Sequence, residues 1–216
     1  MHWVRNFPLL LVIAIPLGAF ALESQDAVII KSLVSNGNVG ICSGVLITPK
    51  HILTAAHCVE NNSNFKVAFT NSSDPSDWVT GQDPIPSPKY NSAISLSKYD
   101  IAILELNQPL VPTPNYQFKP ICKFNHLGDG VYRVGFGGRN GLNVKNTFNL
   151  YVFDLTKAKV SIEMEDPLSV QGDSGGPIYA YENGAACLLA VHSTIDLNFT
   201  PQVSYNTLIY ATLNIY

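Results

Sequence analysis

Short runs of β-branched, aromatic and other apolar residues recur along the chain. Turn residues separate them, whereas apolar positions at helical spacing are scarce. The first run, residues 28–34, ends at an Asn-Gly-Asn turn sequence at 36–38. Many short runs with regular turns between them are typical of a β-barrel or a β-sandwich. The pattern therefore predicts an all-β fold, with further strands near 41–47, 66–69, 101–104, 131–134, 150–153, 177–180 and 188–191.

Two proline-rich segments separate these runs. Residues 71–90 are rich in Ser, Asp and Pro, and we predict a loop there. Residues 106–120 contain four prolines near the middle of the chain, so we interpret them as a linker between two halves. The last residues, about 207–216, suit either a strand or a short helix.

The first 21 residues carry a different pattern. Arg5 precedes a short apolar stretch at 8–15, and Ala-Phe-Ala at 19–21 matches a signal peptidase site. We therefore predict a signal peptide over residues 1–21 and a secreted, extracellular chain with no membrane contact after its removal. A membrane anchor is the alternative, but the apolar stretch is short and is interrupted by proline and glycine.

Composition narrows the function classes. The chain has 216 residues, enough for one domain or for two small lobes that share an interface. Apolar residues make up 46% and charged residues 13%, which argues against disorder. The net charge of −3, with no run of Lys and Arg, gives no electrostatic footprint for nucleic acid.

An exported chain meets an oxidising compartment, in which its four cysteines are expected to pair. Counting alone allows three connectivities among Cys42, Cys58, Cys122 and Cys187. The chain also contains three sequons. Sequons arise by chance in chains rich in Asn and Ser, but in a eukaryotic host these three would mark glycosylated surface loops. Their asparagines are Asn61, Asn71 and Asn198.

The strongest chemical signal is the segment 172–177, Gly-Asp-Ser-Gly-Gly-Pro. A nucleophilic serine needs an exposed hydroxyl on a tight turn and backbone N–H groups aimed at the developing oxyanion. Glycines permit such a turn because they tolerate positive φ and let a substrate approach the backbone. An ordinary glycine-rich turn is the alternative, but such a turn does not require these residues in this order.

Two further segments hold candidates for a general base and its carboxylate. His57 lies beside Cys58, and a bond from that cysteine to Cys42 would join two strands and hold the base. Asp100 opens the apolar run 101–104, at the edge of a core where it can accept a hydrogen bond from an imidazole. Each signal is weak alone, because a lone histidine is usually structural and Asp before a strand is commonly a turn residue.

These segments, together with Ser-Gly-Val-Leu-Ile at 43–47, resemble the trypsin/chymotrypsin family of serine proteases, whose catalytic residues also come in the order His, Asp, Ser. The resemblance covers roughly residues 28–195. It implies two orthogonally packed six-stranded antiparallel β-barrels with the active site in the cleft between them. The protease domain would span 22–216, with one barrel over about 22–108 and the other over about 121–216.

By position, the resemblance assigns a role to each candidate. Ser174 would attack the scissile carbonyl and form an acyl-enzyme, His57 would transfer the proton, and Asp100 would hold the imidazole. The N–H groups of Gly172 and Ser174 would form the oxyanion hole. Ser193 would support the buried Asp and border the substrate strand. We expect a monomer that acts on proteins or peptides and needs no metal or organic cofactor.

Activation and disulfides depart from the family pattern. The family's active chain starts with Ile-Val-Gly-Gly, whose freed amine pairs with the Asp before the nucleophile, here Asp173. No such motif occurs ahead of residue 28. Either Asp173 has another partner or the amine of Leu22 serves as that partner.

The disulfides depart from the family pattern as well. Val170 stands where one cysteine of the family's pocket disulfide would be. Cys122 and Cys187 match no family pair securely, and arithmetic alone suggests that they bond together.

The specificity pocket departs as well. Leu168 stands where trypsin-like members have an Asp, so we expect no preference for Lys or Arg at P1, the residue before the scissile bond. Ala-Val-His-Ser at 190–193 resembles glutamyl endopeptidases, in which the His binds an acidic side chain. The alternative is a histidine packed on a strand and held by a backbone hydrogen bond. The expected pocket residues are Leu168, Ser169, Gln171, His192 and Ser193.

Two other functions stay open. A protease-like binding module without activity would fit the missing activation segment, but such homologues usually lose a member of the triad, and this chain keeps all three. An esterase or lipase is disfavoured by the chain order of the three residues.

Overall fold

The computed structural model describes residues 27–93, 99–123, 127–138, 149–150, 161–198 and 202–209. The predicted signal peptide lies outside these ranges. The described strands are β1 (Val28–Leu33), β2 (Val39–Thr48), β3 (His51–Thr54), β4 (Ser63–Ala68), β5 (Val79–Pro86), β6 (Ala102–Leu106), β7 (Leu127–Arg133), β8 (Asn149–Leu150), β9 (Ser161–Glu165), β10 (Pro177–Glu182), β11 (Ala185–Asp196) and β12 (Val203–Leu208). Two single-turn 3₁₀ helices accompany them, η1 (Ala56–Cys58) and η2 (Pro75–Asp77).

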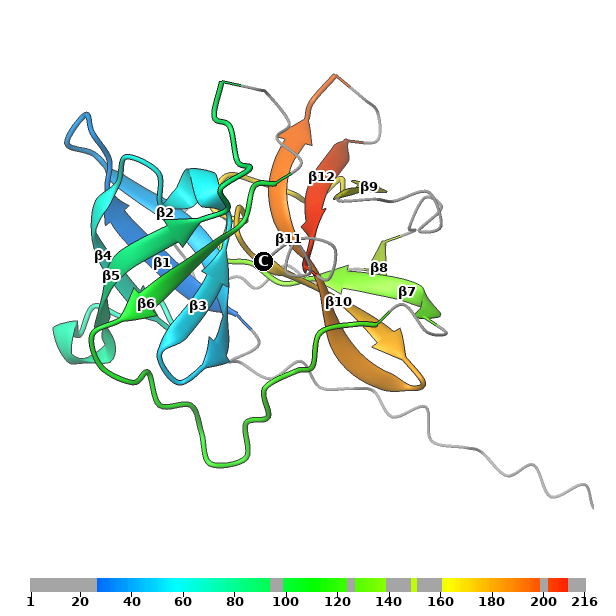
Figure 1. The fold of residues 1–216 in the computed structure, drawn as a ribbon, viewed down its shortest axis with the longest axis horizontal. Coiled ribbons are helices and arrows are strands. Elements are labelled where there is room, and N and C mark those ends of the chain that lie inside the picture. The colour runs from blue at the N-terminus through cyan, green and yellow to red at the C-terminus, as the bar shows by residue number, and fades with distance from the viewer. Residues whose placement is uncertain are drawn as a thin grey trace, which may run out of the picture.

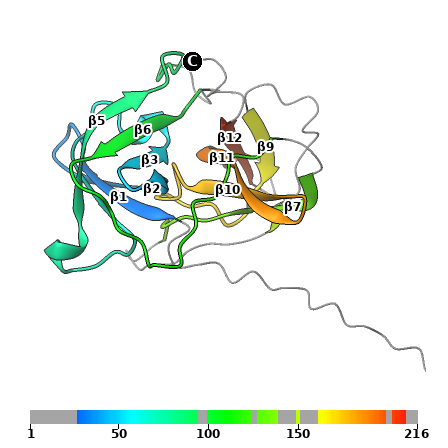
Figure 2. The same cartoon turned by 60° about the horizontal axis from the view of Figure 1, so that its bottom comes forward.

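The strands form two halves. The first six close into an antiparallel barrel in the order β1-β2-β3-β6-β5-β4. The other six form an antiparallel sheet in the order β8-β7-β10-β11-β12-β9. Figure 1 shows the barrel and the sheet side by side, joined by the long segment that follows β6, and Figure 2 shows the same division from another side. The predicted all-β class, with six strands in each half, is confirmed.

The predicted strands overlap β1, β2, β4, β6, β7, β8, β10 and β11, although residues 151–160 lie outside the described part. The loop prediction for 71–90 was wrong over part of its length, because β5 lies within it. Pairing of β5 with β6 is irregular between Gln82 and Ile85, so Pro84, which lacks an N–H, costs no ladder hydrogen bond there. The proline-rich segment after β6 contains no strand between 107 and 120.

The side chains of β1 point alternately to two apolar clusters, and this alternation explains how the barrel and the second sheet meet. Val28 and Ile30 belong to the apolar cluster inside the barrel. Ile29, which points to the opposite face because strand side chains alternate, belongs to a second cluster that also holds Val134 and Val191 from the other half. Ile29, Val134 and Val191 are at most 1% exposed. This second cluster therefore fixes the two halves against each other, and the segments beside it can contribute to one site.

Two disulfides link segments of the described chain. Cys42 bonds to Cys58 across 16 residues, and Cys122 bonds to Cys187 across 65 residues. Both are the pairs expected from the sequence. The first fastens η1 to β2, and the second fastens the inter-half segment to β11. No helix among the described residues is long and apolar enough to cross a membrane.

Candidate active site

Strand pairing brings His57 and Asp100 together. β3 pairs with β6 so that Thr54 lies opposite Ala102. His57 follows Thr54 in η1, and Asp100 precedes Ala102, so both lie just beyond the same end of this strand pair. The Nδ1 of His57 is 2.7 Å from Oδ2 of Asp100, and the backbone N–H of His57 donates to Oδ1 at 2.9 Å.

Asp100 is 2% exposed but well supplied with donors, since the hydroxyl of Ser193 also donates to its Oδ2. Burial acts to raise the pKa of Asp100, but the hydrogen bonds and charge of His57 and the hydrogen bond from Ser193 together lower that pKa below its usual value. The carboxylate is therefore ionised and holds the His57 proton on Nδ1. Nε2 is left as an acceptor, on a side chain that is 34% exposed.

Ser174 lies on the turn before β10. Gly172 and Gly175 have φ of 101° and 81°, in the left-handed region that favours glycine. A side chain on Gly175 would collide with Thr54 and with the carbonyl oxygen of Ser43, both in the barrel. Only glycine at this position lets the turn that carries Ser174 pack against the barrel.

The hydroxyl of Ser174 donates to the carbonyl oxygen of Ser193 at 3.3 Å. Ser193 thus joins the two sides of the site, because its own hydroxyl binds Asp100. Proton transfer to His57 requires the Ser174 hydroxyl to turn from that carbonyl toward Nε2. Hydrogen bonds of this kind commonly tighten only when substrate binds.

Two N–H groups on the turn stay available. The N–H groups of Asp173, Gly175 and Gly176 each donate to a backbone carbonyl, at 3.1, 2.7 and 2.9 Å. Within the described part of the chain, no hydrogen bond takes the N–H of Gly172 or of Ser174. These are the two groups expected to form an oxyanion hole.

Ser43 fixes the shape of this turn from the barrel side. Its hydroxyl donates to the carbonyl oxygen of Gly172 at 2.8 Å and accepts from the N–H of Phe136 at 2.8 Å. Its own N–H donates to the carbonyl oxygen of Ser174 at 2.7 Å. Ser43 belongs to β2, so the turn is held by both halves of the molecule.

Comparison with known proteins identifies the family. The family model described as Trypsin matches residues 23–210. The chain belongs to the trypsin family. Coagulation factor IX of Oryctolagus cuniculus is 38% identical over 108 residues, which cover 47% of this chain and 38% of that protein. Chymotrypsin-like elastase family member 1 of Bos taurus is 25% identical over 181 residues, which cover 72% of this chain and 68% of that protein. The match to factor IX thus leaves most of that protein's length uncovered.

In this trypsin-family chain, Asp173 has a partner that the sequence analysis did not single out. Arg133, at the end of β7, is fully buried, and its Nη1 lies 2.8 Å from Oδ2 of Asp173. Its Nε and Nη2 donate to the two carboxylate oxygens of Asp166, at 2.7 and 3.2 Å. The signal was present as a lone arginine inside the apolar run 131–134, because a charged side chain in a core needs a partner.

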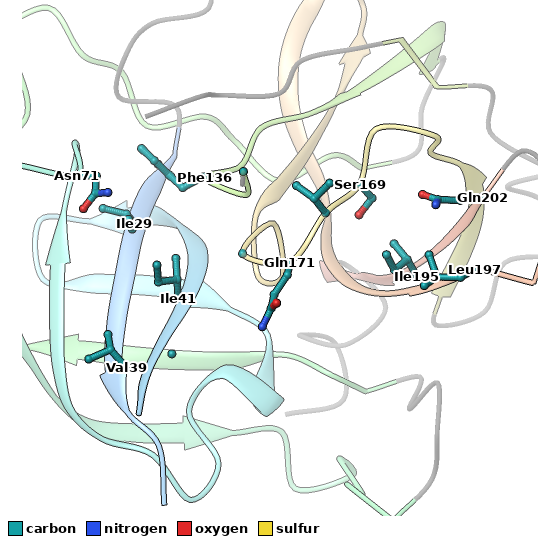
Figure 3. A pocket seen from close by; sticks show the side chains of 14 residues that line it. Ile29, Val39, Ile41, Asn71, Phe136, Ser169, Gln171, Ile195, Leu197 and Gln202 are labelled. Carbon is teal, nitrogen blue, oxygen red and sulfur yellow. The ribbon is translucent and has the colours of Figure 1, made fainter. Parts of the chain in front are cut away.

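A cavity of about 580 Å³ lies beside the turn that carries Ser174. Figure 3 shows its labelled side chains on two sides, with Ile29, Val39 and Ile41 of the barrel on one side and Ser169, Ile195, Leu197 and Gln202 on the other. Gln171 projects between the two groups. No acidic or basic side chain lines the cavity among the described residues.

The predicted pocket residues take different places. Ser169 and Gln171 line the cavity, whereas Leu168 is 55% exposed and does not. His192 and Ser193 are each 2% exposed and do not line it either. Sequence reasoning missed the apolar lining from β1 and β2, since these strands are far in the chain from residues 168–193 and only the fold brings them to the cavity.

His192 is held on both ring nitrogens. Nε2 is 2.9 Å from Oγ of Ser169, and Nδ1 is 3.0 Å from Oδ1 of Asn206. The amide nitrogen of Asn206 donates to Ser204, so Oδ1 is the atom turned to the ring and Nδ1 carries the proton. Ser169 therefore donates to Nε2. Burial first, and then the charge of Arg133, lowers the pKa of His192 to about 3, so the ring is neutral at pH 7.

The three candidate glycosylation sites differ in exposure. Asn61 and Asn198 are exposed, whereas Asn71 is half-buried and lines the cavity. The first adopts a φ of 57°, a conformation that asparagine tolerates in turns. Their glycosylation stays a prediction.

Proposed function

We propose that this chain is a secreted serine endopeptidase that hydrolyses peptide bonds through His57, Asp100 and Ser174. The observation that carries the proposal is the connected set of hydrogen bonds in which Ser193 joins Asp100 and His57 to the nucleophile turn. The free N–H groups of that turn add the donors that an oxyanion needs. The family supports protein or peptide substrates, and two disulfides suit an oxidising compartment.

Each step of acyl transfer has a group to perform it. Ser174 Oγ would attack the substrate carbonyl while its proton passes to Nε2 of His57, and Asp100 would stabilise the imidazolium. The negatively charged oxygen of the tetrahedral intermediate would accept the N–H groups of Gly172 and Ser174. His57 would then protonate the leaving amine, and water would hydrolyse the acyl-enzyme by the same route.

Labelling with a fluorophosphonate probe tests this function. We expect the purified secreted chain to be labelled at Ser174, because an activated serine loses its proton to His57, attacks the phosphorus of the probe and displaces fluoride from it. The Ser174→Ala variant is the matched control and is expected to stay unlabelled. Mass spectrometry of the labelled peptide locates the adduct. A folded, processed chain that resists the probe would instead support the silent binding module.

We further propose that P1 is an uncharged side chain. Among the described residues the cavity offers no carboxylate to pair with Lys or Arg, and its wall beside Ser169 carries Val170, Ile195 and Leu197. An acidic P1 would need the Ser169 proton turned away from His192 and a proton added to that ring. The depressed pKa of His192 disfavours this protonation above pH 3.

A peptide library with varied P1 tests the proposal. We expect cleavage after Lys or Arg to be at least about 100-fold slower than cleavage after the preferred uncharged residue, because their charge would be buried without a partner. Glu at P1 is expected to stay disfavoured at neutral pH. Preferred cleavage after Glu, increasing as the pH is lowered because His192 takes up a proton, would establish the acidic interpretation instead.

A further inference from the structure

A buried arginine stands between two buried carboxylates, at the root of the nucleophile turn. Arg133, Asp166 and Asp173 are all 0% exposed. Arg133 binds Asp166 through Nε and Nη2 and lies 2.8 Å from Asp173 through Nη1. Charged side chains are almost never fully buried unless they are paired, and removing one partner of such a pair is strongly destabilising. The arrangement therefore fixes where Asp173 can lie.

Asp173 in turn fixes the turn that carries Ser174. Its Oδ2 accepts the N–H of Val170, and its Oδ1 accepts the N–H of Gly137, each at 3.0 Å. Its backbone N–H donates to Val170, and its carbonyl accepts from Gly176. Through its carboxylate and its backbone, Asp173 thus joins the start of the turn, its end and the segment after Arg133. Its position decides whether the N–H groups beside it point outward.

We propose that Arg133 is the internal counter-ion of Asp173 and holds the oxyanion turn in its working shape, so that no chain-terminal amine is needed for activity. This assignment rests on the proposed endopeptidase function. Arg133 is a positioning residue, because it acts on the reaction only through Asp173 and the turn. The chain is then competent once folded, without an activating cleavage.

The geometry suits a guanidinium better than an amine. A guanidinium has a planar fork that can bind Asp166 with two nitrogens and still present the third to Asp173. A side chain at Gly137 would come within 2.6 Å of the Asp173 carboxyl carbon, so this segment approaches the carboxylate as closely as only glycine allows. Arg133 and the backbone donors already engage both oxygens of Asp173.

Behaviour at alkaline pH distinguishes a guanidinium counter-ion from an α-amine counter-ion. Within the described residues, the titratable groups that face Arg133 are Asp166, Asp173 and His192. An α-amine loses its charge near pH 8, or somewhat higher when paired, whereas a guanidinium stays charged beyond about pH 12. The turn of this chain is therefore expected to keep its shape through the alkaline range.

The first test uses the full chain in two forms, one with its processed N-terminus and one with a short acetylated extension. We expect the two rates of Ser174 labelling by fluorophosphonate to agree within about twofold and to show no alkaline loss up to about pH 10.5. A turn that depended on the amine would lose an oxyanion donor, and with it about 100-fold or more in rate. A loss of that size in the extended form would overturn the assignment.

Variants of the arginine form the second test. Arg133→Met is expected to slow labelling about 100-fold or more, and Arg133→Lys to recover only part of the rate, since one ammonium cannot bind both carboxylates as a fork does. Lys66→Met, which removes an exposed charge from β4, is the matched control and should label normally. A folded Arg133→Met protein that labels like the natural chain would also overturn the assignment.

Hydrogen exchange of residues 170–176 in a Ser174→Ala background keeps the assignment testable without activity. We expect protection to be the same with and without the extension and to fall in Arg133→Met. If no form is labelled but exchange follows this pattern, the endopeptidase function fails while the role of Arg133 stands. If Arg133→Met does not fold, the labelling rates and exchange of the extended and unextended forms still test the role of Arg133. Protection that is lost on extension contradicts the assignment.

Discussion

Replacing His57 by alanine is expected to lower kcat for peptide hydrolysis by about 10⁶-fold. The variant loses the acceptor for the Ser174 proton and the donor for the leaving amine. Asp100 keeps its hydrogen bonds from the backbone N–H of residue 57 and from Ser193, so the fold should persist. Steady-state hydrolysis of a P1-optimised peptide measures the effect, with thermal unfolding as the check on folding.

The pH dependence of the remaining activity of His57→Ala is informative. Without a general base, hydroxide has to remove the serine proton, so the residual rate should rise about tenfold per pH unit. A loss of less than about 100-fold, or a residual rate that does not depend on pH, would show that another group serves as the base.

Replacing Asp100 by asparagine is expected to lower kcat by about 10⁴-fold at neutral pH. The asparagine has one acceptor, and the N–H of His57 at 2.9 Å is the donor that this acceptor would satisfy. Its amide nitrogen would then face Nδ1 and Ser193 and donate where the carboxylate accepted. The imidazole would carry its proton on Nε2 and be unable to receive one from Ser174.

Nitrogen NMR of the imidazole identifies the tautomer in Asp100→Asn, and peptide hydrolysis gives the rate. The matched control is Asp77→Asn, an exposed carboxylate on η2 that should hydrolyse peptide at the natural rate. Natural activity in Asp100→Asn, with the proton still on Nδ1, would remove Asp100 from the proposed mechanism.

The strands could be predicted where apolar alternation was strong. Val28 and Ile30 enter the barrel core while Ile29 enters the cluster between the halves, and such a doubly buried strand reads as a continuous apolar run. β5 was missed because Pro84 and Pro86 are turn residues in most settings. Whether a proline ends a strand depends on which ladder positions need an N–H, and that depends on the partner strands.

Some of the site residues named from the sequence lie where we expected them in the structure, and others do not. The structure brings His57, Asp100, Ser174 and Ser193 into one hydrogen-bonded set. Ser169 lines the cavity but its proton is directed to His192, and Leu168 lies on the surface instead. The side-chain environment of these pocket residues depends on Asn206 and Ser204 of β12, which no local pattern links to them.

The sequence by itself determined the family, most of the strands and the reactive segments. These features are local: a nucleophile turn needs its glycines in order, and a strand needs its alternation. Only the tertiary structure decided the partner of Asp173, the charge state of His192 and the lining of the cavity. Burial and the approach of distant groups set those properties, because a charge, a pKa or a hydrogen bond depends on everything within a few ångströms. Arg133 is 40 residues from Asp173 in the chain and 2.8 Å from it in space.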